Sequence, residues 1–207
     1  MPNESLYGRF FASSYDWFLS SLEESKGRKI RSRYIPHLKG DVLELGSGTG
    51  ANFAHYAPET RVVACEPSPA MNRIARDRAT ANIQLLERGV GDPRLEAEIP
   101  DGSRDAVVST LVLCTIPDLP AAVDFCYRKL RPKGQLFIFE HVAAQSRLLH
   151  LIQSLLTPLW RPIGRGCHLN RKTDQQLIRK GFTVLEENRF ALPGFPFYVA
   201  MLEKPAA

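Results

Sequence analysis

The sequence has few cysteines, and their spacing excludes several kinds of site. Only four occur among its 207 residues, and no pair forms a Cys-x-x-Cys motif. Because the wide spacing fits no zinc pattern, we expect no metal. Cys65 and Cys114 stand in apolar, strand-like runs and are expected to be reduced core residues. A reducing cytoplasm is therefore the expected compartment.

Long apolar runs are also absent. No stretch approaches the ~20 apolar residues of a membrane-spanning helix, and residues 1–4 lack the basic start of a signal peptide. We expect a protein that can lie on a membrane but does not cross one. Motifs for nucleic-acid recognition are missing too, so the net charge of +5 indicates only a mild preference for an anionic partner, and we expect no nucleic acid.

The apolar content is sufficient for a globular core. Hydrophobic residues make up 44% of the chain, which argues against global disorder. A chain of this length predicts one domain, which we place at residues 39–207, preceded by a helical segment over residues 1–38.

The predicted domain is organised around residues 41–51. Residues 42–45 predict a short buried strand, after which Gly46, Gly48 and Gly50 alternate with small polar residues. The apolar character after Ala51 suits the start of a helix. A strand, a glycine turn and a helix N-terminus form the usual cofactor site of an open α/β sheet.

This loop fits two kinds of cofactor. Gly46, Gly48 and Ala51 match the dinucleotide pattern G-x-G-x-x-G/A, with Glu66 as the ribose acid. The same glycines match the S-adenosylmethionine (SAM) pattern [ED]-x-G-x-G-x-G, which begins at Glu44. A carboxylate before the turn would repel a pyrophosphate but suits the ammonium and sulfonium groups of SAM. The loop therefore favours SAM over NAD, and a turn that binds nothing is the third interpretation.

Two more acids follow predicted strands. Glu66 ends the strand over residues 61–65, where a carboxylate can accept hydrogen bonds from both ribose hydroxyls. Ser68 then predicts a helix N-cap. Asp92 lies in a turn-rich loop after the strand over residues 83–86, and it is expected either to contact the adenine amine or to serve turn chemistry before a proline.

Two stretches are amphipathic in the helical sense. Aromatic residues recur at three- and four-residue steps between residues 7 and 22, and the basic run 26–33 follows. Residues 148–160 carry a leucine stripe that prolines at 158 and 162 are expected to break. Each stretch predicts either a helix packed on its own domain or a surface over the cofactor that also contacts a membrane or an apolar substrate.

The remaining pattern resembles a known family. A strand, the glycine loop, an acid after the next strand, and the segment 130–136 leading into a fifth strand resemble the class I SAM-dependent methyltransferases across residues 41–142. The resemblance implies a Rossmann-like α/β sheet of seven strands with helices on both faces, an N-terminal helical lid over residues 1–38, and SAM as cofactor with S-adenosylhomocysteine (SAH) as product. Under it the cofactor site comprises Tyr15, Glu44, Gly46, Ser47, Gly48, Gly50, Asn52, Glu66, Pro67, Met71, Gly91, Asp92 and Leu111.

Four segments, 48–53, 110–116, 140–144 and 166–171, resemble the methyltransferase-like 7 group of membrane-associated alkyl thiol S-methyltransferases. Those relatives carry a hydrophobic N-terminal anchor, whereas the opening of this chain is more similar to phospholipid N-methyltransferases and ubiquinone-type C-methyltransferases. The resemblance implies a small or lipid methyl acceptor, first a thiol, then phosphatidylethanolamine or a quinone precursor. Outside this class, an NAD-dependent oxidoreductase and a non-catalytic, membrane-docking protein of the same fold remain as alternatives.

A thiol acceptor must ionise before it can be methylated, because its ordinary pKa near 8.5 leaves little thiolate at neutral pH. His141, at the end of the predicted fifth strand, is the first candidate base. Glu140 either orients it or points into the helix layer, and His168 is the second candidate base. Direct methyl transfer needs no covalent enzyme intermediate, so Cys167 is not expected to be a nucleophile.

Overall fold

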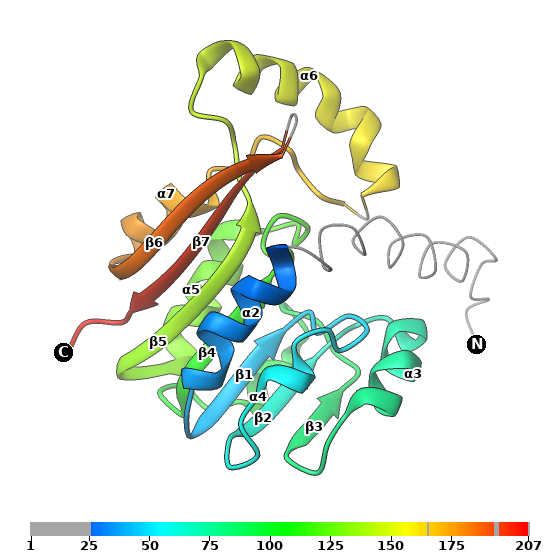
Figure 1. Cartoon of the computed structure of the whole chain (residues 1–207), viewed down its shortest axis with the longest axis vertical. Coiled ribbons are helices and arrows are strands. Elements are labelled where there is room, and N and C mark those ends of the chain that lie inside the picture. The colour runs from blue at the N-terminus through cyan, green and yellow to red at the C-terminus, as the bar shows by residue number, and fades with distance from the viewer. Residues whose placement is uncertain (1–25, 165, 193–194, 207) are drawn as a thin grey trace.

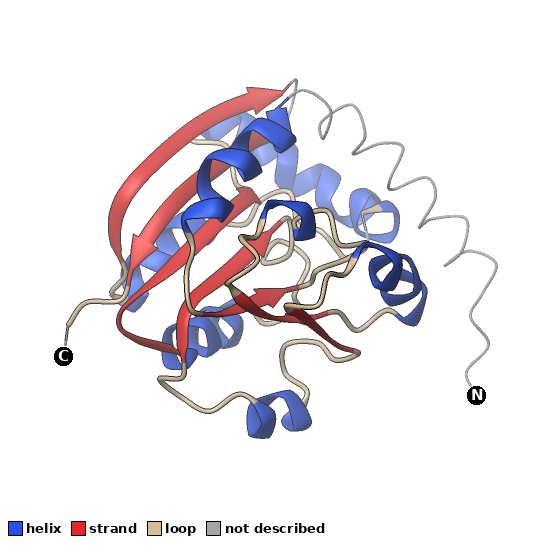
Figure 2. Cartoon of the chain, turned by 60° about the horizontal axis from the view of Figure 1, so that its bottom comes forward, coloured by secondary structure: helices blue, strands red, loops and turns tan. Residues whose placement is uncertain are grey.

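The computed structural model describes residues 26–164, 166–192 and 195–206. The helix expected between residues 7 and 22, with Tyr15, lies outside this part of the chain. A single seven-stranded sheet runs through the molecule in the order β3-β2-β1-β4-β5-β7-β6 (Figures 1 and 2). Its strands are β1 (Asp41–Leu45), β2 (Arg61–Cys65), β3 (Ile83–Leu86), β4 (Arg104–Thr110), β5 (Leu130–His141), β6 (Thr183–Leu192) and β7 (Phe195–Glu203).

The first five strands pair in parallel, and β7 runs antiparallel between β5 and β6. The sequence predicted this seven-stranded sheet, and it is confirmed. The order places β1 and β4 side by side, so the strand order reverses there and the carboxyl ends of β1, β2 and β4 open onto a common crevice.

Helices cover both faces of the sheet (Figure 2). They are α2 (Arg28–Tyr34), α3 (Pro69–Arg78), α4 (Pro93–Glu98), α5 (Leu119–Lys129), α6 (Arg147–Ile163) and α7 (Thr173–Lys180), with short 3₁₀ helices η2 (Ile35–His37) and η3 (Phe53–His55). One core contains Leu95, Phe125 and Leu177, from α4, α5 and α7. The other core contains Tyr34 and Ala75, from α2 and α3.

The end of the expected lid belongs to this second core. The Tyr34 ring stacks on Phe137 of β5 with centroids 5.1 Å apart, and Ile35 and Leu38 are buried with them. The described part of residues 1–38 is thus packed on the sheet, and the domain boundary at residue 38 stays a prediction.

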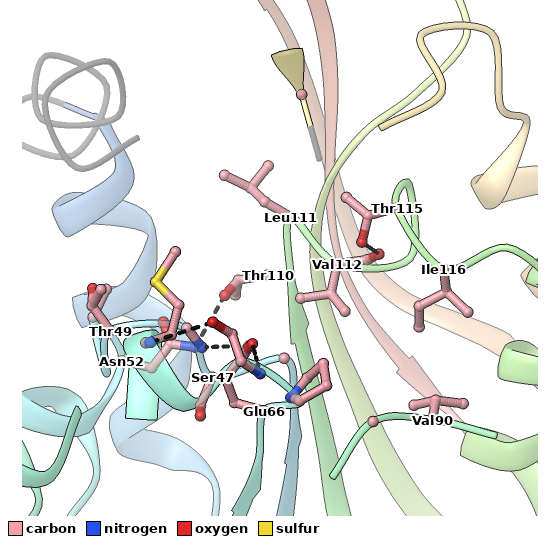
Figure 3. A pocket seen from close by; sticks show the side chains of 18 of the residues that line it. Ser47, Thr49, Asn52, Glu66, Val90, Thr110, Leu111, Val112, Thr115 and Ile116 are labelled. Carbon is pink, nitrogen blue, oxygen red and sulfur yellow. Dashed lines mark hydrogen bonds between the residues drawn. The ribbon is translucent and has the colours of Figure 1, made fainter. Parts of the chain in front are cut away.

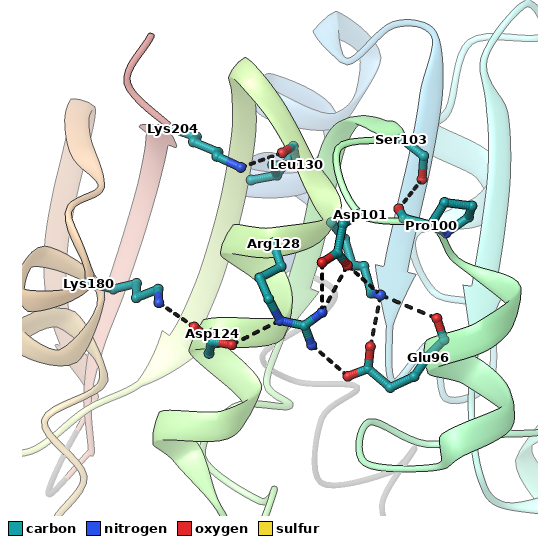
Figure 4. Close-up of polar contacts among 10 residues, drawn as sticks. Glu96, Pro100, Asp101, Ser103, Asp124, Arg128, Leu130, Lys180 and Lys204 are labelled. Atoms are coloured by element: carbon teal, nitrogen blue, oxygen red, sulfur yellow. Dashed lines mark hydrogen bonds and ion pairs between the residues drawn. The ribbon is translucent and has the colours of Figure 1, made fainter. Parts of the chain in front are cut away.

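Ion pairs join the helices of the first core (Figure 4). Arg128 of α5 donates to Glu96 of α4 at 2.8 Å, to Asp101 at 2.8 Å and to Asp124 at 2.9 Å. Lys129, whose side chain is 2% exposed, contacts Glu96 and Asp101 at 2.8 Å each. This cluster fixes α4 against α5.

Three predicted elements differ from the structure. The helix expected after the glycine loop is only the three-residue η3. The helix expected to break at Pro158 and Pro162 continues through both as α6. The loop after β3 contains α4, which begins at Pro93 with Asp92 as its N-cap. None of the described helices is both long and apolar enough to cross a membrane.

Candidate active site

A cavity of about 600 Å³ lies at the carboxyl ends of β1, β2 and β4. Its two halves differ in polarity, as Figure 3 shows. The polar half includes Ser47, Thr49, Asn52 and Glu66, and the apolar half includes Leu111, Val112 and Ile116. Of the predicted cofactor residues, the lining contains Gly46, Ser47, Gly48, Asn52, Glu66, Pro67, Met71 and Leu111.

The three glycines of the loop have different roles. All have positive φ, at 55°, 56° and 83° for Gly46, Gly48 and Gly50. A Cβ on Gly46 would meet Val112 at 2.6 Å, and one on Gly50 would meet Phe53 at 2.6 Å. A Cβ on Gly48 would have its nearest neighbour at 4.0 Å, so it would project into the cavity. Gly48 is therefore where a ligand can approach the backbone, whereas Gly50 serves local packing.

Glu66 holds the loop and faces the cavity. Its carboxylate accepts hydrogen bonds from the backbone N–H groups of Gly48 at 3.2 Å and Ser68 at 2.8 Å. The residue is 9% exposed and lines the cavity at the end of β2. This position fits the predicted ribose acid, because a partly solvated carboxylate can accept from two hydroxyls.

Glu44 acts on the cavity through a neighbour. It is 1% exposed and lies outside the residues that line the cavity, so its predicted part in cofactor binding stays a prediction, and this geometry does not favour direct contact. Asn52 donates to Glu44 at 2.9 Å, and Tyr56 donates to it at 2.8 Å. Burial raises the pKa of Glu44 to about 7, although both hydrogen bonds lower it. The carboxylate thus orients Asn52, which does line the cavity.

An arginine from α2 completes this network. Arg31 Nε donates to Asn52 Oδ1 at 2.7 Å, and the residue is 4% exposed. Arg31 and Arg28 both line the cavity, as does Arg78, whose Nη1 donates to Thr49 Oγ1 at 3.0 Å. These three cations were not predicted from the sequence. The basic run was visible, but nothing local showed that α2 turns two of its arginines inward.

The apolar wall is the loop after β4. Leu111 has φ 60°, which ends the strand at Thr110 and turns the chain over the cavity. Glu140 anchors the loop from behind: it is fully buried and accepts from Ser109 Oγ at 2.7 Å and from the Val112 and Leu113 N–H groups at 2.9 and 3.0 Å. Its carboxylate therefore shapes the wall.

Glu140 does not orient His141, because neighbouring residues of a strand point to opposite faces of the sheet. The His141 ring instead lies against Phe195 and Phe197, with centroids 5.6 and 5.8 Å away. It is 4% exposed and is outside the cavity lining, and burial lowers its pKa to about 4. Its role in catalysis stays a prediction that this geometry does not favour.

His168 and Asp92 also lie outside the lining. His168 donates its backbone N–H to Cys114 O at 2.9 Å, behind the apolar wall. Asp92 accepts from the Arg94 N–H at 2.9 Å and pairs with its guanidinium, which holds the carboxyl pKa down at about 2. The turn-chemistry interpretation of Asp92 fits this structure, and the adenine contact does not. Gly89 and Val90 line the cavity in place of Gly91 and Asp92.

The sheet order, the glycine loop and the acid after β2 define a class I SAM-dependent methyltransferase. The short η3 also offers no long helix N-terminus for a pyrophosphate, which removes the structural basis of the NAD alternative. A family model described as a methyltransferase domain matches residues 43–138.

Proteins of similar sequence and a solved structure of similar fold are consistent with this class. The human thiol S-methyltransferase TMT1B is 37% identical over 174 residues, covering 80% of this chain and 71% of the relative. Human TMT1A is 32% identical over 191 residues, covering 91% and 75%. A SAM-dependent methyltransferase from Thermotoga maritima superimposes with a TM-score of 0.67 at 19% identity, covering 95% of this chain and 97% of that chain. The chain belongs to the methyltransferase family that includes TMT1A and TMT1B, with SAM as methyl donor and SAH as product.

Proposed function

We propose that this methyltransferase acts on a small or membrane-partitioned thiol. The observation that carries the proposal is its relationship to TMT1A and TMT1B, at 32% and 37% identity over most of the chain. The cavity supports it, because an apolar wall for an alkyl chain faces a polar half that bears arginines. A lipid amine or a quinone precursor as acceptor is the alternative.

The chain's own residues divide the work. Gly48, Asn52 and Glu66 fit the cofactor, because an open backbone, an oriented amide and a carboxylate in the cavity lining face one cavity. Bound SAM supplies a methyl group activated by its sulfonium. The wall of Leu111, Val112 and Ile116 excludes water from the acceptor, which raises the reactivity of a thiolate.

Arg28 is our candidate for promoting ionisation of the acceptor. It lines the cavity from α2 and its side chain is exposed there. A nearby cation lowers the pKa of a thiol, and the proton then passes to water without a protein base. The predicted histidines are therefore not needed for this step.

The test is the pH dependence of methyl transfer to a small alkyl thiol. In Arg28→Gln we expect the rate near pH 7 to fall about three- to tenfold and to recover near pH 9, because the thiol then ionises unaided. Lys29→Gln, on the same helix but outside the cavity lining, is the matched control and should keep the wild-type profile. An equal loss of rate at every pH would mean that Arg28 only helps to bind the acceptor. If neither the wild type nor any variant forms the thioether, the thiol proposal is refuted.

We further propose that the protein works in the cytoplasm, in contact with a membrane. All four cysteines are free, which suits a reducing compartment. Support for the membrane contact comes from the exposed apolar residues of α6.

A further inference from the structure

Helix α6 is amphipathic, but its apolar face points away from the protein. Seven large apolar side chains on this helix are between 42% and 72% exposed: Leu148, Leu149, Leu151, Ile152, Leu155, Leu156 and Leu159. Elsewhere in the described residues only Ile178 and Leu185 are exposed large hydrophobics. An amphipathic surface helix normally places its apolar stripe on the core, so this helix is inverted.

The polar stripe of α6 faces the protein instead. Gln153 and Thr157 are 4% and 6% exposed. Gln153 Oε1 accepts from the Ala144 N–H at 2.7 Å, and Ser154 Oγ accepts from Asn170 Nδ2 at 3.2 Å. These bonds fix the rotation of the helix about its axis, so the leucines cannot turn inward without leaving buried polar groups unpaired.

The charged side chains of α6 and of the segments directly before and after it have one sign. From His141 to Thr173 the sequence contains no aspartate or glutamate, while five arginines and lysines occur there. Two of these, Arg147 and Arg161, stand at the two ends of α6 and are exposed. Leucines between flanking cations complement an apolar layer beneath anionic headgroups.

We infer that α6 docks on an anionic lipid surface, with its leucines in the interfacial layer and Arg147 and Arg161 among the headgroups. A second copy of the chain is a poorer occupant, because a symmetric contact would bring together faces whose charged side chains are all cationic. Gly164, directly after α6, lines the cavity, so the docked helix places the cavity beside the lipid. Entry of a lipid-dissolved acceptor by this route rests on the proposed function.

The experiment is flotation of the full-length protein with vesicles of phosphatidylcholine, with and without phosphatidylglycerol. Leu155→Gln/Leu159→Gln replaces two of the most exposed leucines, at 68% and 72%. We expect it to lower partitioning about tenfold or more. The matched control is Ile178→Gln/Leu185→Gln, which removes exposed apolar side chains of α7 and β6 and should bind as wild type does. Arg147→Gln/Arg161→Gln should lose the preference for phosphatidylglycerol.

Equal partitioning of wild type and Leu155→Gln/Leu159→Gln would overturn the inference. The inference would also be overturned if the wild type does not bind vesicles but forms a dimer that Leu155→Gln/Leu159→Gln dissociates. The apolar face of α6 would then be covered by a second copy of the chain. Calorimetric SAH binding and methylation of a soluble thiol should be unchanged in the variant. Failure of docking is therefore distinguishable from failure of the thiol proposal.

Discussion

Two acidic residues follow neighbouring strands, and the structure gives them different surroundings. Glu66 faces the cavity and holds the Gly48 N–H, whereas Asp92 caps α4 and pairs with Arg94. We expect Glu66→Ala to weaken SAH binding roughly ten- to hundredfold, because hydrogen bonds to a charged acceptor are lost. Asp92→Ala should leave the affinity unchanged and lower the stability of the protein through the lost N-cap. Titration calorimetry with SAH and urea denaturation separate the effects, and the reverse order of affinities would show that the ribose acid is misplaced.

The buried carboxyl of Glu44 predicts a pH dependence. Burial raises its pKa from 4.5 to about 7 in the folded protein. The folded state therefore holds a proton that the unfolded state releases, so this group stabilises below about pH 4.5 and loses that contribution as the pH rises to about 7.

In Glu44→Gln this contribution disappears. We expect the stability difference between wild type and variant to shrink as the pH rises through that window, measured by urea denaturation at each pH. Taking the difference cancels groups that titrate in both proteins, such as His141. A difference that is constant across the window would show that Glu44 is ionised throughout.

At the residue scale the sequence predicted backbone sites better than side-chain directions. Gly48 and Glu66 followed from their places after strands, where parallel sheets form their sites. The histidine at position 141 also follows a strand, but the alternation of β5 turns it toward Phe195 and Phe197, and register cannot be read from one strand alone. Arg28 and Arg31 reach the cavity only because Tyr34 packs on Phe137 and fixes α2.

At the scale of elements, the ion-pair cluster of α4 and α5 makes a stability prediction. Lys129→Met keeps a buried, apolar side chain but removes the ammonium group, which contacts Glu96 and Asp101 and lies over the Phe125 ring. We expect a loss of about 1–2 kcal/mol near pH 7, and Lys133→Met, which breaks the exposed pair with Glu203, should change stability by less than about 0.5 kcal/mol.

The same cluster predicts that the loss of stability in Lys129→Met depends on pH. The hydrogen bond from Lys129 lowers the pKa of Asp101, so this stabilisation is present above the unfolded pKa and is lost as the pH falls through the folded pKa. The difference in unfolding free energy between wild type and Lys129→Met should therefore become smaller as the pH falls below the ordinary pKa of an aspartate, measured by urea denaturation. A difference that does not become smaller would mean that Lys129 stabilises through packing alone.

Strands could be predicted more closely than the segments between them. The bounds predicted for β2 and β3, residues 61–65 and 83–86, agree with the structure, because each is a short, mostly apolar run between turn residues. The break expected at Pro158 did not occur, since Pro158 and Pro162 both lie inside α6, which continues to Ile163. The short η3 was not visible either, since its sequence is as apolar as that of a longer helix.

For the whole molecule, the strand order decides where the chemistry lies. The crevice between β1 and β4 brings the glycine loop, Glu66 and the wall after β4 to one cavity, while β6 and β7 extend the sheet away from it. α6 lies at the end of the molecule toward which the carboxyl ends of the parallel strands point (Figure 1). One surface can thus present both the cavity and a lipid-binding face. The leucine stripe alone left open whether the helix packs on its own domain or lies over the cofactor site.

The most direct test of the account is a competition for one methyl donor. Labelled SAM is incubated with the protein, a small alkyl thiol, phosphatidylethanolamine vesicles and a quinone precursor in one reaction, and the label is followed by mass spectrometry. We predict that the label appears as the thioether of the alkyl thiol. Label confined to the phospholipid or to the quinone product would contradict the thiol assignment.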